Sequence, residues 1–461
     1  MNLKGRIYRR RTRLWTGVPA ILLVVLMLSS SAGAQMAMGP DADRDYPIDK
    51  KNQLAVIDSV AAALNKIYVF PEMAAEMEKL IRQRYRDGAY KDITSPMEFS
   101  IKLTEDLRSI CHDRHLGVRW FPPEYFEGFA GDDTLTDAER DHQLLQSQRD
   151  NFGFKKLEVK PGNIGYVKFD GFSDTYNAGA TAVAAMNFLA HCDAIIFDLR
   201  ENGGGSPSMI QLLSSYFFDT LTHLNSFYIR REDTTQQFWT TRYVSGPRMA
   251  KADLYILTSG YTFSAAEEFT YNFKNLSRAT IVGETTGGGA HPVDDVYYPD
   301  LMIGVRVPFG RAINPISGTN WEGTGIKPHI EVPADQALDR AYLEALKVQS
   351  AGAVDEQHRF GLDWAVAGLE AKLNPITLDP ALLASYAGSF GPRTLSFEDG
   401  ALYYQREDRP KMKMIPMADD LFWFDDVDYF RLQVVVDDDG TPLKLIGHYD
   451  NGRTDESERT P

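Results

Sequence analysis

Short apolar runs alternate with segments of helical spacing between residues 164 and 282, and this order constrains the fold more than any other feature. The runs have the length and the Val, Ile and Tyr content of buried strands, and they lie at residues 164–169, 194–199, 253–257 and 279–282. Helical spacing is found between them, at residues 180–189, 212–218 and 264–276. Strands and helices in alternation predict an α/β core in which helices cover a sheet.

The regions on either side of this core have different patterns. Before it, apolar residues recur every three or four positions in three segments, the third of which opens with the helix-capping sequence Ser95-Pro-Met-Glu. These three helices are expected to bury their apolar stripes against one another. After it, Asp-Gly pairs at 399–400 and 439–440 separate alternating strands, which is typical of hairpins. We expect a helical bundle at residues 45–120, a core at 121–350 and a small antiparallel β-domain at 375–461.

The first 34 residues predict a secretory signal peptide. They contain six basic residues and no acidic one, then an apolar stretch at residues 18–28, and they end in Ala32-Gly-Ala34. The apolar stretch is shorter than the roughly 20 residues that span a membrane. We therefore expect cleavage after Ala34, a periplasmic or extracellular protein, and no stable membrane span after cleavage.

The net charge bears on the binding partners of the protein, and the cysteines bear on disulfide bonds and metal sites. The formal net charge of −15 makes nucleic acid an unfavourable partner, because an anionic chain repels a phosphate backbone. The two cysteines, Cys111 and Cys192, either pair or remain buried thiols, and neither is accompanied by the set of ligands that a metal site requires.

Ser264 stands where a predicted strand gives way to a predicted helix. A hydroxyl in this place can attack a carbonyl carbon, with the backbone N–H of Ala265 beside it to bind the developing oxyanion. The sequence Ser-x-x-Glu from Ser264 to Glu267 is also a capping box, and on these residues alone the capping role is favoured.

Three glycines follow the predicted strand at residues 194–199. Gly203, Gly204 and Gly205 allow the backbone to approach a ligand and to turn neighbouring N–H groups toward it. This is typical of an oxyanion hole, and a flexible loop is the alternative. The Lys and Ser/Thr of a phosphate-binding loop are missing.

Two histidines, His112 and His115, lie at the junction of the bundle and the core. No third ligand group accompanies them, so we expect no metal site. Either histidine is compatible with a structural role, and beside an exposed serine it would be a general base.

The sequences at residues 198–205, 262–267 and 282–289 occur in an order that resembles one family of serine peptidases. This family includes tail-specific (C-terminal processing) proteases, tricorn protease and the interphotoreceptor retinoid-binding protein. The resemblance extends over about residues 45–340. It implies a ClpP/crotonase-like β/α core after a helical bundle, and it makes Ser264 the expected nucleophile.

The resemblance also bears on the base that serves Ser264. Tail-specific proteases use a lysine about 25 positions after the serine, where this chain has Gly289. Lys274 lies ten positions along the predicted helix, about 15 Å away and on another face. The Ser/Lys dyad is therefore absent.

The tricorn-like branch uses a histidine and a glutamate instead, and these match His115 and Glu322. The resemblance implies His115 as the base, Glu322 as the group that orients it, and an oxyanion hole from the N–H groups of Gly203 or Gly204 and Ala265. Tricorn-like sites have a further polar residue beside the histidine, and this chain has Arg114 in that neighbourhood. His291, just after the second glycine-rich stretch, is the second-ranked base.

These observations predict an exported serine peptidase that cleaves peptides or proteins through an acyl-enzyme, without metal or cofactor. The alternative is a non-catalytic binding protein of the same fold that holds an apolar ligand or a peptide, as the retinoid-binding relatives do. The sequence shows no PDZ-like insertion between the bundle and the core.

Overall fold

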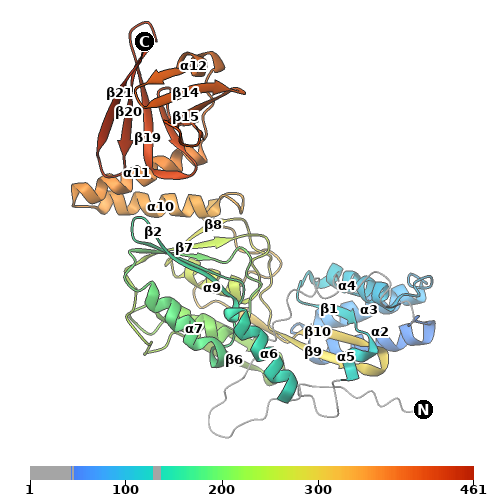
Figure 1. The fold of residues 1–461 in the computed structure, drawn as a ribbon. Coiled ribbons are helices and arrows are strands. Elements are labelled where there is room, and N and C mark those ends of the chain that lie inside the picture. The colour runs from blue at the N-terminus through green and yellow to red at the C-terminus, as the bar shows by residue number, and fades with distance from the viewer. Residues whose placement is uncertain (1–42, 44–45, 128–136, 461) are drawn as a thin grey trace. The chain divides into compact units, whose positions relative to one another are not determined.

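The computed structural model describes residue 43, residues 46–127 and residues 137–460 (Figure 1). The predicted signal peptide at residues 1–34 lies outside the described residues. The chain is a mixed α/β protein with a helical N-terminal region and antiparallel sheets at its C-terminal end, which confirms the predicted fold class. Within the described residues, no helix is long and apolar enough to cross a membrane.

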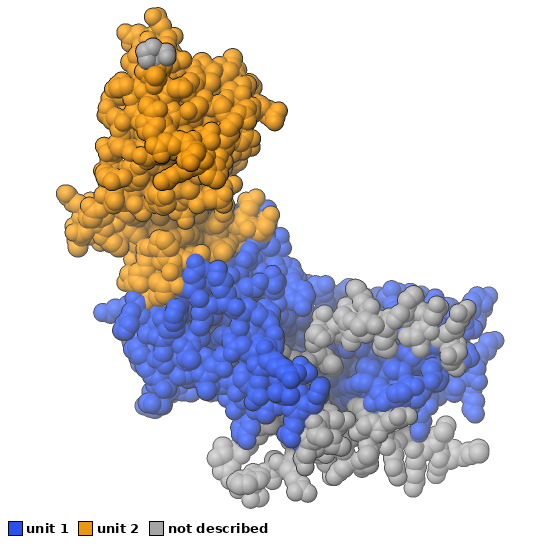
Figure 2. Space-filling model, in the orientation of Figure 1, with its two compact units in different colours: residues 1–158, 166–191, 197–334 blue, residues 159–165, 192–196, 335–461 orange. Residues whose placement is uncertain are grey.

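The chain divides into two compact units (Figure 2). The first comprises residues 1–158, 166–191 and 197–334, and the second comprises residues 159–165, 192–196 and 335–461. The predicted helical bundle and the residues of the predicted catalytic site belong to the first unit.

The three predicted N-terminal helices are present, and each begins at a capping side chain or at a proline. They are α2 (Lys50–Ile67), α3 (Pro71–Arg86) and α4 (Pro96–Cys111). The side chain of Asp49 accepts the N–H of Asn52 at 2.7 Å, and Ser95 Oγ accepts that of Glu98 at 3.0 Å. The helix α3 has proline in its first turn instead of a side-chain cap.

The apolar faces of these helices pack on a three-stranded antiparallel sheet as well as on one another. The sheet has the order β1 (Gly117–Trp120), β10 (Ile303–Pro308), β9 (Val293–Tyr298). Val60, Leu103 and Leu107 from the helices share one buried core with Val296 and Val305 from the strands. The helices thus bury their stripes against one another and also against a hairpin from residues 293–308, which completes their core.

The central sheet contains all four strands predicted from the alternating pattern. Its order is β12 (Ile330–Glu331), β8 (Thr280–Gly283), β7 (Asp253–Thr258), β4 (Ala194–Asp198), β3 (Ile164–Phe169), β2 (Phe154–Lys160). The intervening helices are α7 (Thr175–Phe188), α8 (Pro207–Ser215) and α9 (Ala265–Asn275). The helix α8 begins five residues before the predicted start at residue 212, because Ser206 caps it and Pro207 occupies its first turn.

The first unit also contains two further helices and a second three-stranded sheet. The helices α5 (Pro123–Glu127) and α6 (Asp137–Arg149) follow β1. A second three-stranded sheet has the order β11 (Gly310–Ile313), β5 (His223–Ile229), β6 (Thr234–Trp239).

The second unit contains the predicted C-terminal β-structure. Its helices are α10 (Ala337–Gly352), α11 (Glu356–Leu373) and α12 (Pro380–Ser385). One sheet has the order β13 (Gly388–Phe390), β14 (Arg393–Glu398), β15 (Ala401–Arg406), β16 (Met412–Lys413). The other has the order β17 (Ile415–Pro416), β18 (Leu421–Phe424), β19 (Val427–Val436), β20 (Pro442–Tyr449), β21 (Thr454–Glu458). Both predicted Asp-Gly hairpins are confirmed, at β14–β15 and β19–β20.

Candidate active site

Ser264 immediately precedes α9 and has an unusual backbone conformation. Its φ of 54° and ψ of −121° lie outside the regions that residues with a side chain normally occupy. Such a conformation costs about 1–3 kcal/mol and persists only where the surroundings enforce it. Strain of this kind is concentrated at functional sites, and Ser264 is half-buried instead of enclosed.

The carboxylate of Glu267 holds Ser264 in this conformation. One oxygen accepts the backbone N–H of Ser264 at 2.9 Å and that of Gly289 at 2.8 Å. The other accepts the N–H of Gly288 at 2.7 Å and the hydroxyl of Thr286. Burial raises the pKa of Glu267 to about 7, although its four donors act in the opposite direction. The predicted capping residue thus also fastens the serine turn to the glycine loop, which we define as residues 286–291.

Gly204 lies directly against the serine. A Cβ built on Gly204 would be 2.7 Å from the Cβ of Ser264, and the φ of Gly204 is +105°. Only glycine fits this position without strain.

The amides predicted to form the oxyanion hole are not equally free. The N–H of Gly203 donates to the carbonyl of Asp170 at 3.2 Å, and that of Gly204 donates to Asn202 Oδ1 at 2.9 Å. The N–H of Ala265, at the first position of α9, has no acceptor among the described residues. Ala265 is therefore the available donor in this structure.

His115 lies beside Phe263, which precedes the serine, and beside Gly289 of the glycine loop. Its ring is 4.7 Å from the ring of Phe263, centroid to centroid, and a Cβ built on Gly289 would be 2.6 Å from its Cε1 atom. Burial is the main cause that lowers the pKa of His115 to about 4, so the ring is neutral at pH 7. Its buried Nδ1 has no partner among the described residues.

Arg114 links the same turn to the glycine loop. Its guanidinium donates to the carbonyl oxygen of Gly287 at 2.6 Å. The neighbour of His115 therefore has a positioning contact across a sequence separation of 173 residues.

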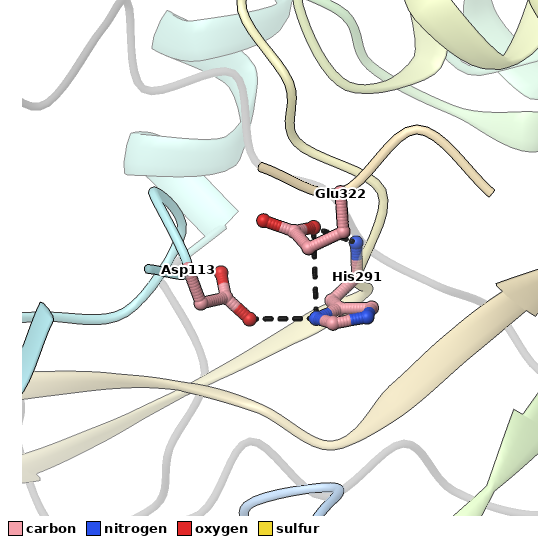
Figure 3. A group of neighbouring side chains, drawn as sticks. All are labelled: Asp113, His291 and Glu322. Atoms are coloured by element: carbon pink, nitrogen blue, oxygen red, sulfur yellow. Dashed lines mark hydrogen bonds and ion pairs between the residues drawn. The ribbon is translucent and has the colours of Figure 1, made fainter. Parts of the chain in front are cut away.

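His291 lies in a different environment, between two carboxylates (Figure 3). Its Nδ1 is 2.6 Å from Asp113 Oδ2 and 3.5 Å from Glu322 Oε2. Glu322 Oε2 also accepts the backbone N–H groups of Ala290 at 2.6 Å and of His291 at 3.2 Å. The structure therefore brings Glu322 to His291, and the contacts of Glu322 are not with His115.

Asp113 and Glu267 have no catalytic role in the sequence-based expectation, although they organise the site. Asp113 is two positions before His115 and is fully buried, and a buried acidic residue always needs a partner. Its partner, His291, is 178 positions away, so no local pattern indicates the contact.

The donor atoms of Asp113, His291 and Glu322 lie within 4.8 Å of one another, which is close enough for three ligands of one metal ion. Hydrogen bonds occupy Asp113 Oδ2, His291 Nδ1 and Glu322 Oε2. The second oxygen of Glu322, Oε1, is buried and has no hydrogen-bond partner among the described residues.

Comparison with known proteins bears directly on this site. The model of peptidase family S41 matches residues 163–332, and that of the N-terminal domain of peptidase S41 in eukaryotic IRBP matches residues 50–145. The chain belongs to peptidase family S41. The S41 match includes Ser264, His291 and Glu322, whereas His115 falls in the match to the N-terminal domain.

One relative of known name is a protease. A tail-specific protease of Haemophilus influenzae is 26% identical over 156 residues, which are 32% of this chain and 20% of that protein. The chain thus matches about a fifth of the length of this S41 relative.

Solved structures that resemble the chain include two proteases. The photosystem II D1 C-terminal processing protease has a TM-score of 0.40 and 15% identity, and the match covers 62% of this chain and 94% of that one. The tricorn protease has a TM-score of 0.41 and 14% identity, and the match covers 70% of this chain and 37% of that one.

Proposed function

We propose that this S41 chain is an exported serine peptidase that hydrolyses peptide bonds through an acyl-enzyme on Ser264. The observation that carries the proposal is a strained serine at the start of α9 whose neighbour in the chain, Phe263, packs against the ring of His115. Burial lowers the pKa of His115, which keeps this ring neutral at pH 7. A serine hydroxyl needs a neutral imidazole to take its proton, and the depressed pKa of His115 keeps the ring in that form.

In the proposed reaction, His115 removes the proton of Ser264 while the hydroxyl oxygen attacks the carbonyl carbon of the substrate. The N–H of Ala265 donates to the oxyanion, and the imidazolium then gives its proton to the leaving amine. Water, deprotonated by the same ring, releases the acyl group. For Gly203 or Gly204 to add a second donor, its N–H must exchange its present acceptor for the oxyanion.

Glu322 keeps its proposed supporting role, and its contacts suggest that this role is exerted through His291. We expect Glu322→Gln to lower turnover strongly while the fold is retained, because the amide can turn its NH2 group toward the backbone N–H groups of Ala290 and His291 that the carboxylate accepts. Export is supported by the basic and apolar start of the sequence.

A second candidate is a binding protein of the same fold, with no turnover. The engaged amides of Gly203 and Gly204 favour it, because a complete oxyanion hole normally has two free donors. A fluorophosphonate probe separates the two candidates. Labelling of the wild type but not of Ser264→Ala supports the peptidase, and a folded wild type that remains unlabelled supports the binding protein.

A further inference from the structure

One carboxylate links the two candidate histidines. Asp113 Oδ1 accepts the backbone N–H of His115 at 2.9 Å, and Asp113 Oδ2 contacts Nδ1 of His291 at 2.6 Å. Asp113 is fully buried and His291 is nearly so. The turn that presents the His115 ring is therefore fixed to the glycine loop through Asp113.

The contacts of this group favour a proton on His291. Burial alone would lower the pKa of His291, but the hydrogen bond with Asp113 and the charges of Asp113 and Glu322 raise it above its ordinary value. Burial likewise opposes ionisation of Asp113, but its hydrogen bond and charge contact with His291 hold its pKa below the usual range. Burial and the charge of Asp113 raise the pKa of Glu322. An ionised Asp113 paired with a protonated His291 is the state that these contacts favour.

We propose that Asp113 and His291 are positioning residues for His115. Ionised Asp113 holds the turn, protonated His291 holds Asp113, and together they set the place of the His115 ring and the electric field that it experiences. This inference rests on the proposed function, since it assigns His115 as the base of Ser264.

The field at His115 has contributions of both signs. Asp113 stabilises a proton on His115, and the nearby positive charge of His291 opposes it. The other charged or titratable groups that act on these three residues come from the surrounding elements and are Tyr68, Arg108, Cys111, Arg306, Arg311 and Glu322. Replacing His291 with a neutral residue removes one of the positive contributions at His115 and leaves the negative contribution of Asp113, together with the positive ones of Arg108 and Arg306.

The test is the pH dependence of kcat/KM for peptide hydrolysis by the full chain. In His291→Gln the amide still donates to Asp113, but the positive charge is gone. The pKa of His115 then rises, so the acid limb of the profile moves to higher pH by about one unit. The matched control is His358→Gln, at an exposed histidine of α11, which leaves the profile unchanged.

A second pair of variants tests the contact with the turn. Asp113→Ala removes the acceptor of the His115 N–H, and we expect kcat to fall by at least about tenfold with little change in KM. Asp113→Asn retains an oxygen for that N–H and recovers part of kcat. Circular dichroism establishes that each variant is folded, and His291→Asn replaces His291→Gln if the latter does not fold.

A folded His291 variant whose pH profile superimposes on that of the wild type overturns the inference, and so does an Asp113→Ala variant with wild-type kcat. In both cases the fluorophosphonate labelling of wild-type Ser264 leaves the proposed function intact. A wild type that is not labelled overturns the proposed function and this inference with it.

Discussion

The surroundings of His115 and His291 give the two rings different chemistry. His115 has an unpaired Nδ1 and a pKa of about 4, whereas Nδ1 of His291 is held by Asp113 and its pKa is raised. A neutral ring can take a proton from a serine, and a protonated one cannot. The ranking of His115 above His291 stays a prediction, and the two environments support it.

Alanine substitution of each histidine tests this ranking. We expect His115→Ala to lower peptide turnover by at least about 10³-fold, because the serine loses its base. His291→Ala should retain measurable turnover, because it removes a positioning group. Initial rates at pH 7 of folded variants provide the measurement, and the reverse order of activities would contradict the assignment.

Gly204 offers a test of the close approach at the nucleophile. Gly204→Ala places a methyl group 2.7 Å from the Cβ atom of Ser264, on a residue whose φ is +105°. We therefore expect the free energy of unfolding to fall by about 1–3 kcal/mol. We also expect fluorophosphonate to label Ser264 much more slowly. Gly260→Ala is the matched control, since no atom lies within 4 Å of its added Cβ. Equal labelling rates in the two variants would show that Gly204 does not shape the site.

At the scale of elements, local patterns predicted the helices and strands well because each depends on its own residues. The cap at Ser95 and the spacing of apolar residues suffice to place α4. What the hairpin β9–β10 packs against could not be predicted in this way, because its partners lie some 200 residues earlier in the chain. The contact of Asp113 with His291 depends on the same long-range packing.

The Ser-x-x-Glu sequences that begin at Ser95 and Ser264 differ in the burial and hydrogen bonding of their glutamates, and this difference leads to a prediction. Glu267 is buried and accepts four hydrogen bonds, whereas Glu98 at the start of α4 is exposed. In Glu267→Gln, the hydrogens of the new amide face backbone N–H donors. We therefore expect the free energy of unfolding to fall by about 3 kcal/mol and turnover to be lost as well. Glu98→Gln should change stability by less than about 0.5 kcal/mol. Denaturant unfolding measures both, and similar losses would mean that Glu267 only caps α9.

At the scale of the whole molecule, each compact unit has a hydrophobic core of its own. Val305 is fully buried in the core of the first unit, and Leu432 is fully buried in that of the second. Since these cores have no residue in common, we expect each unit to have its own unfolding transition.

Calorimetry of the full chain tests this expectation. Val305→Ala and Leu432→Ala should each destabilise one transition, by about 2 kcal/mol or more, and leave the other unchanged. A matched control is Val348→Ala at a half-exposed position of α10, which should shift neither. A single transition that both core variants lower equally would show that the units unfold together.

The central claim is that Ser264 becomes acylated, and trapping the acyl-enzyme tests it most directly. The full chain is mixed with an activated acyl ester, quenched with acid, and analysed by intact mass and peptide mapping. We predict one acyl group on the peptide that contains Ser264, none in Ser264→Ala, and slow formation in His115→Ala. An acyl group on another residue, or the same yield in Ser264→Ala as in the wild type, would contradict the claim.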